Sequence, residues 1–107
     1  MKTRVTVIDG IPYTVVIGQN RHENWRLLDD ADPRDIWFHA NGSSSAYAIL
    51  YAPDADVVPY SVVKFCAEHI DSNDVIYTRV SNLRKGKKIG EAVILDTKLI
   101  TRLIVRG

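Results

Sequence analysis

The chain has 107 residues, 46% of them hydrophobic, and its 14 basic and 13 acidic side chains leave a formal net charge of +1. This size and apolar content predict one domain over residues 1–107 with one hydrophobic core. No apolar run approaches the roughly 18 residues that cross a membrane, and the N-terminal apolar stretch is too short for a signal-peptide core. A single cysteine excludes an internal disulfide, so we expect an intracellular, cytoplasmic protein without membrane attachment.

The N-terminal segment predicts a hairpin and a short helix. Period-two alternation predicts strands over residues 4–8 and 13–17. The Asp9-Gly10 pair favours a tight turn between them, which we expect Ile11-Pro12 to widen. Residues 21–28 are polar but carry apolar side chains three apart, which favours one or two helical turns against the sheet.

The middle of the chain predicts two strands and the main helix. Residues 36–40 are apolar and aromatic enough for a strand, and residues 41–45 predict a loop. Residues 46–51 have apolar side chains on both faces, so we expect a central strand. Apolar residues at helical spacing predict a helix over residues 59–70, in which Cys66 is a core residue rather than a nucleophile.

The C-terminal third predicts a strand over residues 75–79, a basic loop, and a second hairpin formed by residues 92–95 and 100–105. The fold class expected from these elements is α+β. It is a single domain with a mostly antiparallel sheet, one main helix and one short helix.

Positive charge is concentrated in residues 79–88, the basic tract, which holds five of the 14 basic residues and no acidic residue. The rest of the chain has 9 basic against 13 acidic residues, so the tract is the part suited to binding a polyanion. The alternative is that these side chains are merely solvated. The five residues are Arg79, Arg84, Lys85, Lys87 and Lys88.

Two further groups of side chains are candidates for the same surface. Trp37 and His39 alternate along one strand and project to the same face, where they would stack on a base or hydrogen-bond to a phosphate. The favoured alternative is that Trp37 packs under the loop and His39 is a buried histidine whose ring nitrogens hold the serine loop, because large aromatic side chains are mostly buried. Ser43, Ser44 and Ser45 either present hydroxyls and backbone N–H groups to a phosphate or are ordinary turn residues.

No arrangement in the sequence indicates an enzyme. The serines near His39 lack a G-x-S-x-G elbow, and no pair of titratable groups is spaced for acid–base chemistry. His22, His39 and His69 are far apart and lack ligand spacing, so we expect no metal and no cofactor.

The stretch 35–39 (DIWFH) followed by 42–46 (GSSSA) resembles the signature of the NFACT-R domain, the RNA-binding module of ribosome quality-control factors. The resemblance continues in the same order from about residue 7 to residue 105. Ser44-Ser45-Ala46 is similar to the branch of that family that contains the coiled-coil-domain-containing 25 protein, although Tyr47 replaces a histidine. The resemblance implies binding of RNA.

These observations favour a non-enzymatic RNA-binding module that contacts the backbone of tRNA or rRNA, in a translation or ribosome quality-control context and as part of a ribosome-associated assembly. The alternatives are a DNA-binding domain and a protein-interaction adaptor that uses the basic loop; the oligomeric state stays open. The candidate nucleic-acid-binding residues are Arg79, Arg84, Lys85, Lys87, Lys88, Trp37, His39, Ser44, Ser45, Arg21 and Arg26.

Overall fold

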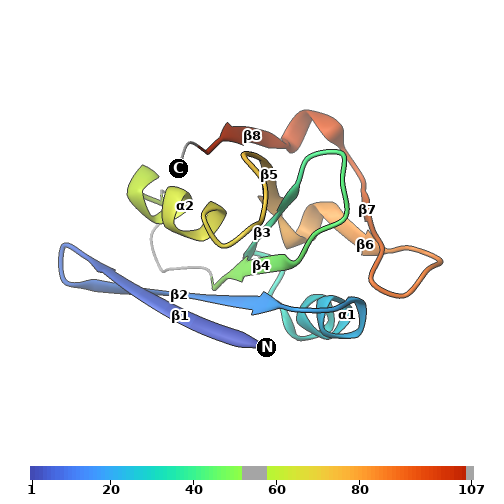
Figure 1. Ribbon diagram of the computed structural model, residues 1–107, viewed down its shortest axis with the longest axis horizontal. Coiled ribbons are helices and arrows are strands. Elements are labelled where there is room, and N and C mark those ends of the chain that lie inside the picture. Colours follow the sequence, from blue (N-terminus) through green and yellow to red (C-terminus); the bar gives the residue numbers. More distant parts are fainter. Residues whose placement is uncertain (52–57, 106–107) are drawn as a thin grey trace.

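A computed structural model describes residues 1–51 and 58–105 of the chain (Figure 1). In chain order its elements are β1 (Lys2–Ile8), β2 (Ile11–Gly18), α1 (Arg21–Asp30), β3 (Ile36–Ala40), β4 (Tyr47–Leu50), α2 (Tyr60–Ala67), β5 (Asp74–Arg79), η1 (Val80–Asn82), β6 (Leu83–Lys85), β7 (Ala92–Ile94), η2 (Thr97–Leu99) and β8 (Thr101–Ile104).

Six strands form one antiparallel sheet in the order β1-β2-β4-β3-β5-β8, and β6 pairs with β7 in a separate two-stranded ribbon. The expected α+β class with a mostly antiparallel sheet is therefore confirmed. The strand predicted over residues 36–40 has the predicted bounds, and the strand β4 is central, with all four of its residues buried.

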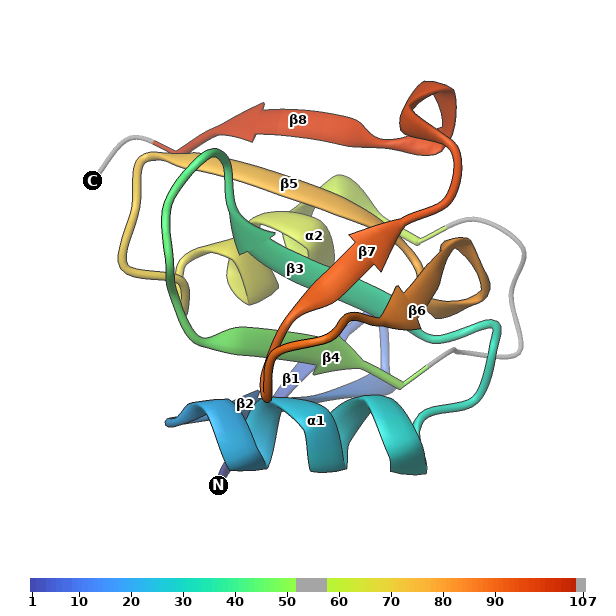
Figure 2. The same cartoon turned by 90° about the vertical axis from the view of Figure 1, so that its right-hand side faces the viewer.

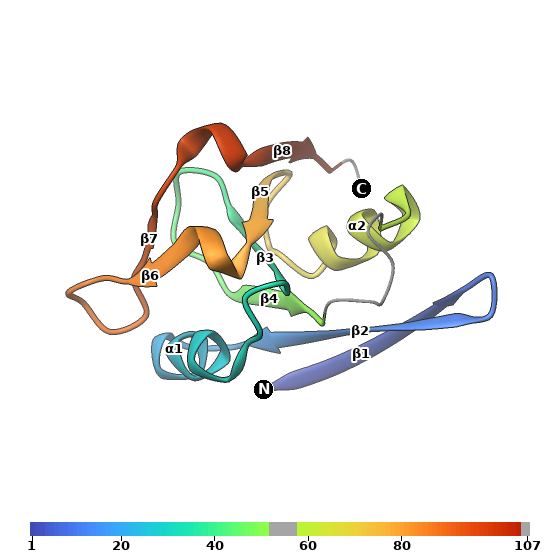
Figure 3. The ribbon, with the colours of Figure 1, turned by 180° about the vertical axis from the view of Figure 1, so that it is seen from behind.

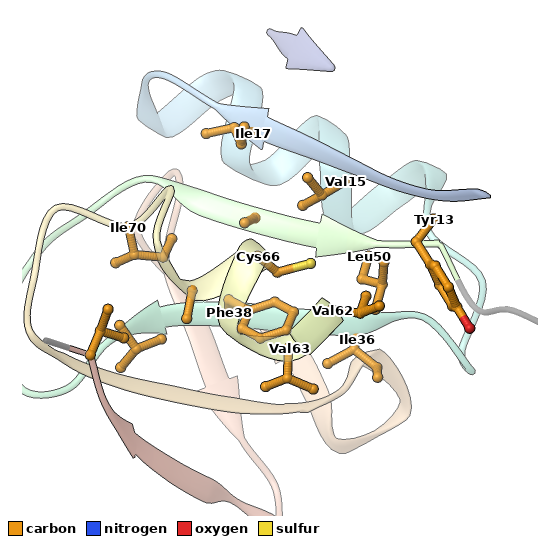
Figure 4. Packing of buried hydrophobic residues seen from close by; sticks show 14 of the residues in the cluster. Tyr13, Val15, Ile17, Ile36, Phe38, Leu50, Val62, Val63, Cys66 and Ile70 are labelled. Carbon is orange, nitrogen blue, oxygen red and sulfur yellow. The ribbon is translucent and has the colours of Figure 1, made fainter. Parts of the chain in front are cut away.

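The six-stranded sheet is covered on both faces because its central strands carry apolar side chains on both sides. On one face, α2 packs over a core that includes the fully buried Phe38 and Cys66 (Figure 4). On the other face, residues of α1 and the β6–β7 ribbon pack with Trp37, Tyr47 and Ile49. Figure 2 shows α1 and the ribbon on this side of the sheet. The view from behind shows α2 on the far side of the sheet from the ribbon (Figure 3).

The first hairpin has a tighter turn than the sequence suggested. Ile8 pairs directly with Ile11, so Asp9 and Gly10 alone form the turn. Both have positive φ, 53° and 77°, as a two-residue hairpin turn of type I′ requires. The expectation that residues 11–12 widen the turn is wrong, since both belong to β2.

The relative lengths of the two helices are the reverse of those expected. The helix predicted as short, α1, has ten residues, whereas α2 has eight. The Asn20 side chain caps α1 by accepting from the Glu23 N–H at 2.9 Å, and the Glu23 carboxylate accepts from the Gln19 N–H at 2.9 Å. This reciprocal capping stabilises a helix whose residues are largely polar. Pro59 precedes α2 as its N-cap, with an extended ψ of 143°.

The expected second hairpin is also wrong, because β7 pairs with β6 and β8 pairs with β5. The buried Asn82 side chain explains the change of direction between β7 and β8. Its Oδ1 accepts from the Asp96 N–H at 2.9 Å, and its Nδ2 donates to the Asp96 carbonyl at 2.9 Å. Asp96 in turn caps η2 by accepting from the Lys98 N–H. The chain therefore leaves the ribbon at Asp96 and reaches the edge of the main sheet.

The helix α1 approaches the sheet closely at Gly18. A Cβ added there would lie 2.5 Å from Asn24 Oδ1 and 3.1 Å from Leu27 Cδ1. Both of these helix residues are buried. A residue without a side chain at the end of β2 is therefore what allows α1 to dock.

We expect Gly18→Ala to lower the free energy of unfolding by about 1–3 kcal/mol, because α1 must move away from β2. Urea denaturation measures this change. Gly86→Ala is the matched control, since the atoms that an added Cβ would meet there belong to the exposed side chain of Glu91, which can move at the cost of one hydrogen bond to the Lys87 N–H. Equal losses in the two variants would contradict close helix docking at Gly18.

Candidate functional site

A solvent-open pocket of about 930 Å³ lies between the N-terminal end of α1, the β3–β4 loop and the β6–β7 loop. Figure 2 shows these three segments on the face of the sheet opposite α2. Its lining combines aromatic residues from β3 and β4 with polar and basic residues from the surrounding segments. These include Gln19, Asn20, Arg21, Asn24, Trp37, His39, Asn41, Ser43, Ser44, Ser45, Tyr47, Ile76, Lys88, Gly90 and Glu91.

Three aromatic residues, Trp37, His39 and Tyr47, form what we call the aromatic floor of the pocket. The Trp37 and His39 rings are stacked, with centroids 5.3 Å apart and planes 7° apart. Tyr47 meets both rings edge-on, at 5.3 Å from Trp37 and 5.1 Å from His39. Trp37 is only 2% exposed, so the favoured alternative of a buried indole is confirmed, and an open Trp37 face for stacking is not what the structure has.

Tyr47 attaches the β6–β7 loop to this floor. Its hydroxyl donates to the Gly90 carbonyl, and burial raises the pKa of the Tyr47 hydroxyl to about 12. Gly90 has a φ of +88°, and a Cβ there would lie 2.6 Å from the Cβ of Arg21. The loop, the start of α1 and the sheet therefore meet at one point. This close approach places Arg21 and Lys88 around the same pocket.

His39 is partly buried in the pocket, and this burial lowers the pKa of its imidazole below 6.5. A hydrogen bond with the Ala40 backbone opposes the shift more weakly. The ionisable side chains that line the same pocket are Arg21, Tyr47, Lys88 and Glu91. The imidazole is therefore neutral at pH 7, so it offers a flat ring with one donor and one acceptor rather than a positive charge.

The two candidate serines differ in their environment. The Ser45 hydroxyl accepts from the Ala40 N–H at 3.0 Å and donates to the Ala46 carbonyl at 2.9 Å. It therefore stabilises the β3–β4 loop and is not free to bind a phosphate, which corrects its place among the candidates. Ser43 and Ser44 are exposed at the pocket, and neither hydroxyl has a hydrogen-bond partner within the described residues.

The basic tract is not one loop and not one surface. Residues 83–85 form β6, so only residues 86–91 form a loop. Arg79 lies beside Ile36, at the opposite end of β3 from the pocket, where its Nη1 donates to the Arg34 carbonyl at 2.6 Å. Lys85 forms an ion pair with Asp29 at 2.7 Å and lies over the Trp25 ring at 4.9 Å. Neither residue therefore adds free positive charge to the pocket.

Three cations of the tract remain available. Lys88 lines the pocket, Lys87 is exposed next to it in the β6–β7 loop, and Arg84 is exposed on β6. None of the three has an ion-pair partner within residues 1–51 and 58–105. The Glu91 carboxylate lines the same pocket but accepts from the Lys87 N–H at 3.1 Å, which closes the loop. The pocket is therefore bordered mainly by positive charge.

Of the two candidate arginines of α1, only one lies at the pocket. Arg21 is the first residue of α1 and lines the pocket. Arg26 is exposed elsewhere on the helix, where its charge is one of the smaller causes that lower the pKa of Glu23. The idea that both arginines converge with the tract is correct for Arg21 only. Sequence reasoning missed Gln19 and Asn20, although the Asn20-x-x-Glu23 spacing signals the helix start that places them here.

Within the described part of the chain, no group of three or more His, Cys, Asp or Glu side chains is placed to hold a metal ion. None of the helices described is long and apolar enough to cross a membrane. What these residues offer is a concave surface with a neutral aromatic floor, free hydroxyls and unpaired cations.

The fold and the site define an α+β domain whose sheet carries an open, cation-bordered pocket. No family model matches the chain. It is similar to coiled-coil domain-containing protein 25 of Mus musculus, with 31% identity over 112 residues that cover 88% of this chain and 54% of that protein. The same protein of Danio rerio is 32% identical over 87 residues, covering 69% of this chain and 42% of that protein.

The chain thus spans about half the length of the curated relatives it matches. These relatives support the similarity to the branch that the residues around Ser44 suggested. A solved structure, the C-terminal part of the fibronectin/fibrinogen-binding protein from Streptococcus suis, has a TM-score of 0.74 at 23% identity. The match covers 96% of this chain and 45% of the Streptococcus suis chain, and it shows that the two share a fold.

The depressed pKa of His39 makes stability depend on pH. Well above pH 6.5 the imidazole is neutral in both states, so the native state has its full stability. Below that value the unfolded chain takes up the proton first, and the native state loses stability until its own pKa is reached. We expect urea midpoints measured at about pH 7.5 and about pH 5 to differ less in His39→Gln than in the wild type.

The matched control is His22→Gln, because His22 is exposed on α1. It should retain the pH dependence of the wild type. An unchanged pH dependence in His39→Gln would contradict the burial of this imidazole.

Proposed function

We propose that this chain is a non-enzymatic RNA-binding module of the NFACT-R family that contacts the sugar-phosphate backbone of tRNA or rRNA in the cytoplasm, in translation or ribosome quality control. The observation that carries the proposal is the meeting of Arg21 and Lys88 at one pocket. These residues come from different parts of the chain, and neither forms an ion pair with another described residue. Cations arranged around a concave surface favour phosphate groups.

The neighbouring charges support binding of an anion. Glu23, in the first turn of α1, forms an ion pair with the N-terminal ammonium at 3.2 Å, so its negative charge is compensated. Lys87, the neighbour of Lys88 in the loop, is exposed as well. Excess charge on the rest of the chain is negative, which favours binding on this face rather than all around the molecule.

RNA is favoured over other polyanions by the sequence resemblance. The DIWFH and GSSSA segments that resemble the NFACT-R signature fall on β3 and the β3–β4 loop, both of which contribute to the pocket. The signature and the cations are therefore parts of one site. A DNA-binding domain would use the same cations, so a competition between matched RNA and DNA duplexes decides between the two ligands.

We expect the double variant Arg21→Glu/Lys88→Glu to bind a tRNA at least about tenfold more weakly than the wild type, because two phosphate contacts become repulsive. The slope of log K against log salt should become shallower by about 1.4, taking roughly 0.7 for each contact. Fluorescence anisotropy over a salt series measures both quantities. Melting temperature shows whether the variant is folded.

The matched control is Lys64→Glu/Lys98→Glu, which changes the net charge equally. Lys64 lies on α2, across the sheet from the pocket, and Lys98 lies in η2. Binding lowered equally in both double variants would indicate bulk attraction and contradict the site. Tighter binding of the DNA duplex than of the matched RNA duplex would mean that the module is a DNA-binding domain.

Lys85 and Lys88 should differ although they are neighbours in the basic tract. Lys85 is paired with Asp29, so Lys85→Ala should change the affinity for tRNA by less than about twofold. Lys88 has no such partner, and Lys88→Ala should weaken binding severalfold. The same anisotropy assay measures both variants, and a larger loss in Lys85→Ala would show that the whole tract acts as one surface.

A further inference from the structure

We propose that the pocket receives one unpaired nucleotide, with its base against the His39 imidazole and a phosphate at Arg21 and Lys88. This inference rests on the proposed function and names the RNA feature that the site would recognise. It predicts that the module distinguishes RNA with an accessible single base from fully paired RNA of the same charge.

The first argument is the direction of the aromatic stack. Trp37 lies beneath the surface and its ring is parallel to that of His39, which lines the pocket. His39 is therefore the last ring of the stack before the strand ends at Ala40 and the chain turns at Gly42, which has a φ of 78°. A flat base placed on His39 would continue the stack, as bases do on aromatic side chains in single-strand binding sites.

The walls beside His39 are also suited to a base. Tyr47 is the neighbour of His39 on one side, and its ring meets the imidazole edge-on. Ile76 is paired with His39 on the other side and also lines the pocket. The Tyr47 hydroxyl donates to the Gly90 carbonyl, so this wall is held in place before any ligand binds. A pre-formed, partly apolar recess limits the entropy lost when a base enters.

The second argument is the set of unpartnered polar groups at the pocket. The indole Nε1 of Trp37 is buried without a hydrogen-bond partner within the described residues. Buried donors are rarely left unpaired, so this N–H is suited to an acceptor on a ligand that reaches the floor. The hydroxyls of Ser43 and Ser44 are also without partners and lie at the pocket, within reach of a ribose or a base edge.

The third argument is the position of the cations. Arg21 and Lys88 line the same pocket as His39, and Gly90 holds their two segments together through its contact with Arg21. A volume of about 930 Å³ accommodates a nucleotide with its sugar and phosphate. Bases within a duplex are stacked on both faces and cannot enter, so the occupant is a base from a loop, a bulge or a strand end.

The experiment compares three RNA hairpins with the same sequence and stem length. One is fully paired, one carries a single-nucleotide bulge, and one carries the same bulge without its base. The wild-type protein should bind the bulged RNA about tenfold or more tightly than the other two, because base stacking on an aromatic side chain contributes that much. Fluorescence anisotropy at one salt concentration gives the three affinities.

His39 variants assign the preference to this pocket. His39→Ala should lower the affinity for the bulged RNA to that of the paired RNA. His39→Phe keeps a flat ring and should restore the preference, whereas His39→Gln should not. His69→Ala is the matched control and should behave as the wild type, because His69 follows α2, packs against Phe65 and does not line the pocket.

The outcomes separate the two proposals. If the wild type binds all three RNAs equally and Arg21→Glu/Lys88→Glu weakens all of them, the pocket does not read a base, and the backbone-binding function stands. A preference for the bulge that survives in His39→Ala also overturns the inference. If none of the three RNAs binds, both proposals fail.

Discussion

Tyr47 is the constraint on which the site depends. Its backbone N–H donates to the buried Asn24 side chain at 3.2 Å, which fixes α1 against the centre of the sheet. Its ring contacts Trp37 and His39, and its hydroxyl holds the β6–β7 loop through Gly90. One residue of a central strand thus positions a helix, an aromatic stack and a loop. The pocket is a result of these three attachments.

Two glycines are essential to the arrangement that Tyr47 holds together. Gly18 lets α1 approach β2, and Gly90 lets the loop approach the first residue of α1. An added Cβ at either position would overlap with an atom of the helix at 2.6 Å or less. The basic loop and Arg21 can meet only because the backbone is bare at both contacts.

Strands with strong local patterns were predictable from the sequence, and pairings set by tertiary contacts were not. Residues 36–40 alternate clearly and become β3 as expected. The partner of β7 depends on the hydrogen bonds of the buried Asn82, which leave no periodic pattern in the sequence. Apolar spacing alone underestimates the length of α1, because the Asn20 and Glu23 capping pair stabilises a helix whose residues are largely polar.

Charge density along the sequence was a partial guide to the site. The basic tract pointed to the right region, and Lys88 does line the pocket. In the fold, however, Arg79 lies at the other end of β3, and Lys85 forms an ion pair with Asp29. Only the helix docking brings Arg21 to the same place. Clustering along the sequence shows which segment is rich in cations. Strand register and helix packing decide which of these cations share a surface.

The burial of the chain's single cysteine gives it a practical value. Cys66 lies on the buried side of α2 and is fully enclosed (Figure 4), and burial raises the pKa of its thiol to about 12. Because the thiolate is the reactive form, maleimide dyes react poorly with this side chain at neutral pH. A cysteine introduced at Ser43 or Ser44 would then be the preferred attachment point for a fluorophore. Cys66 therefore need not be replaced before such a variant is labelled for distance measurements by energy transfer.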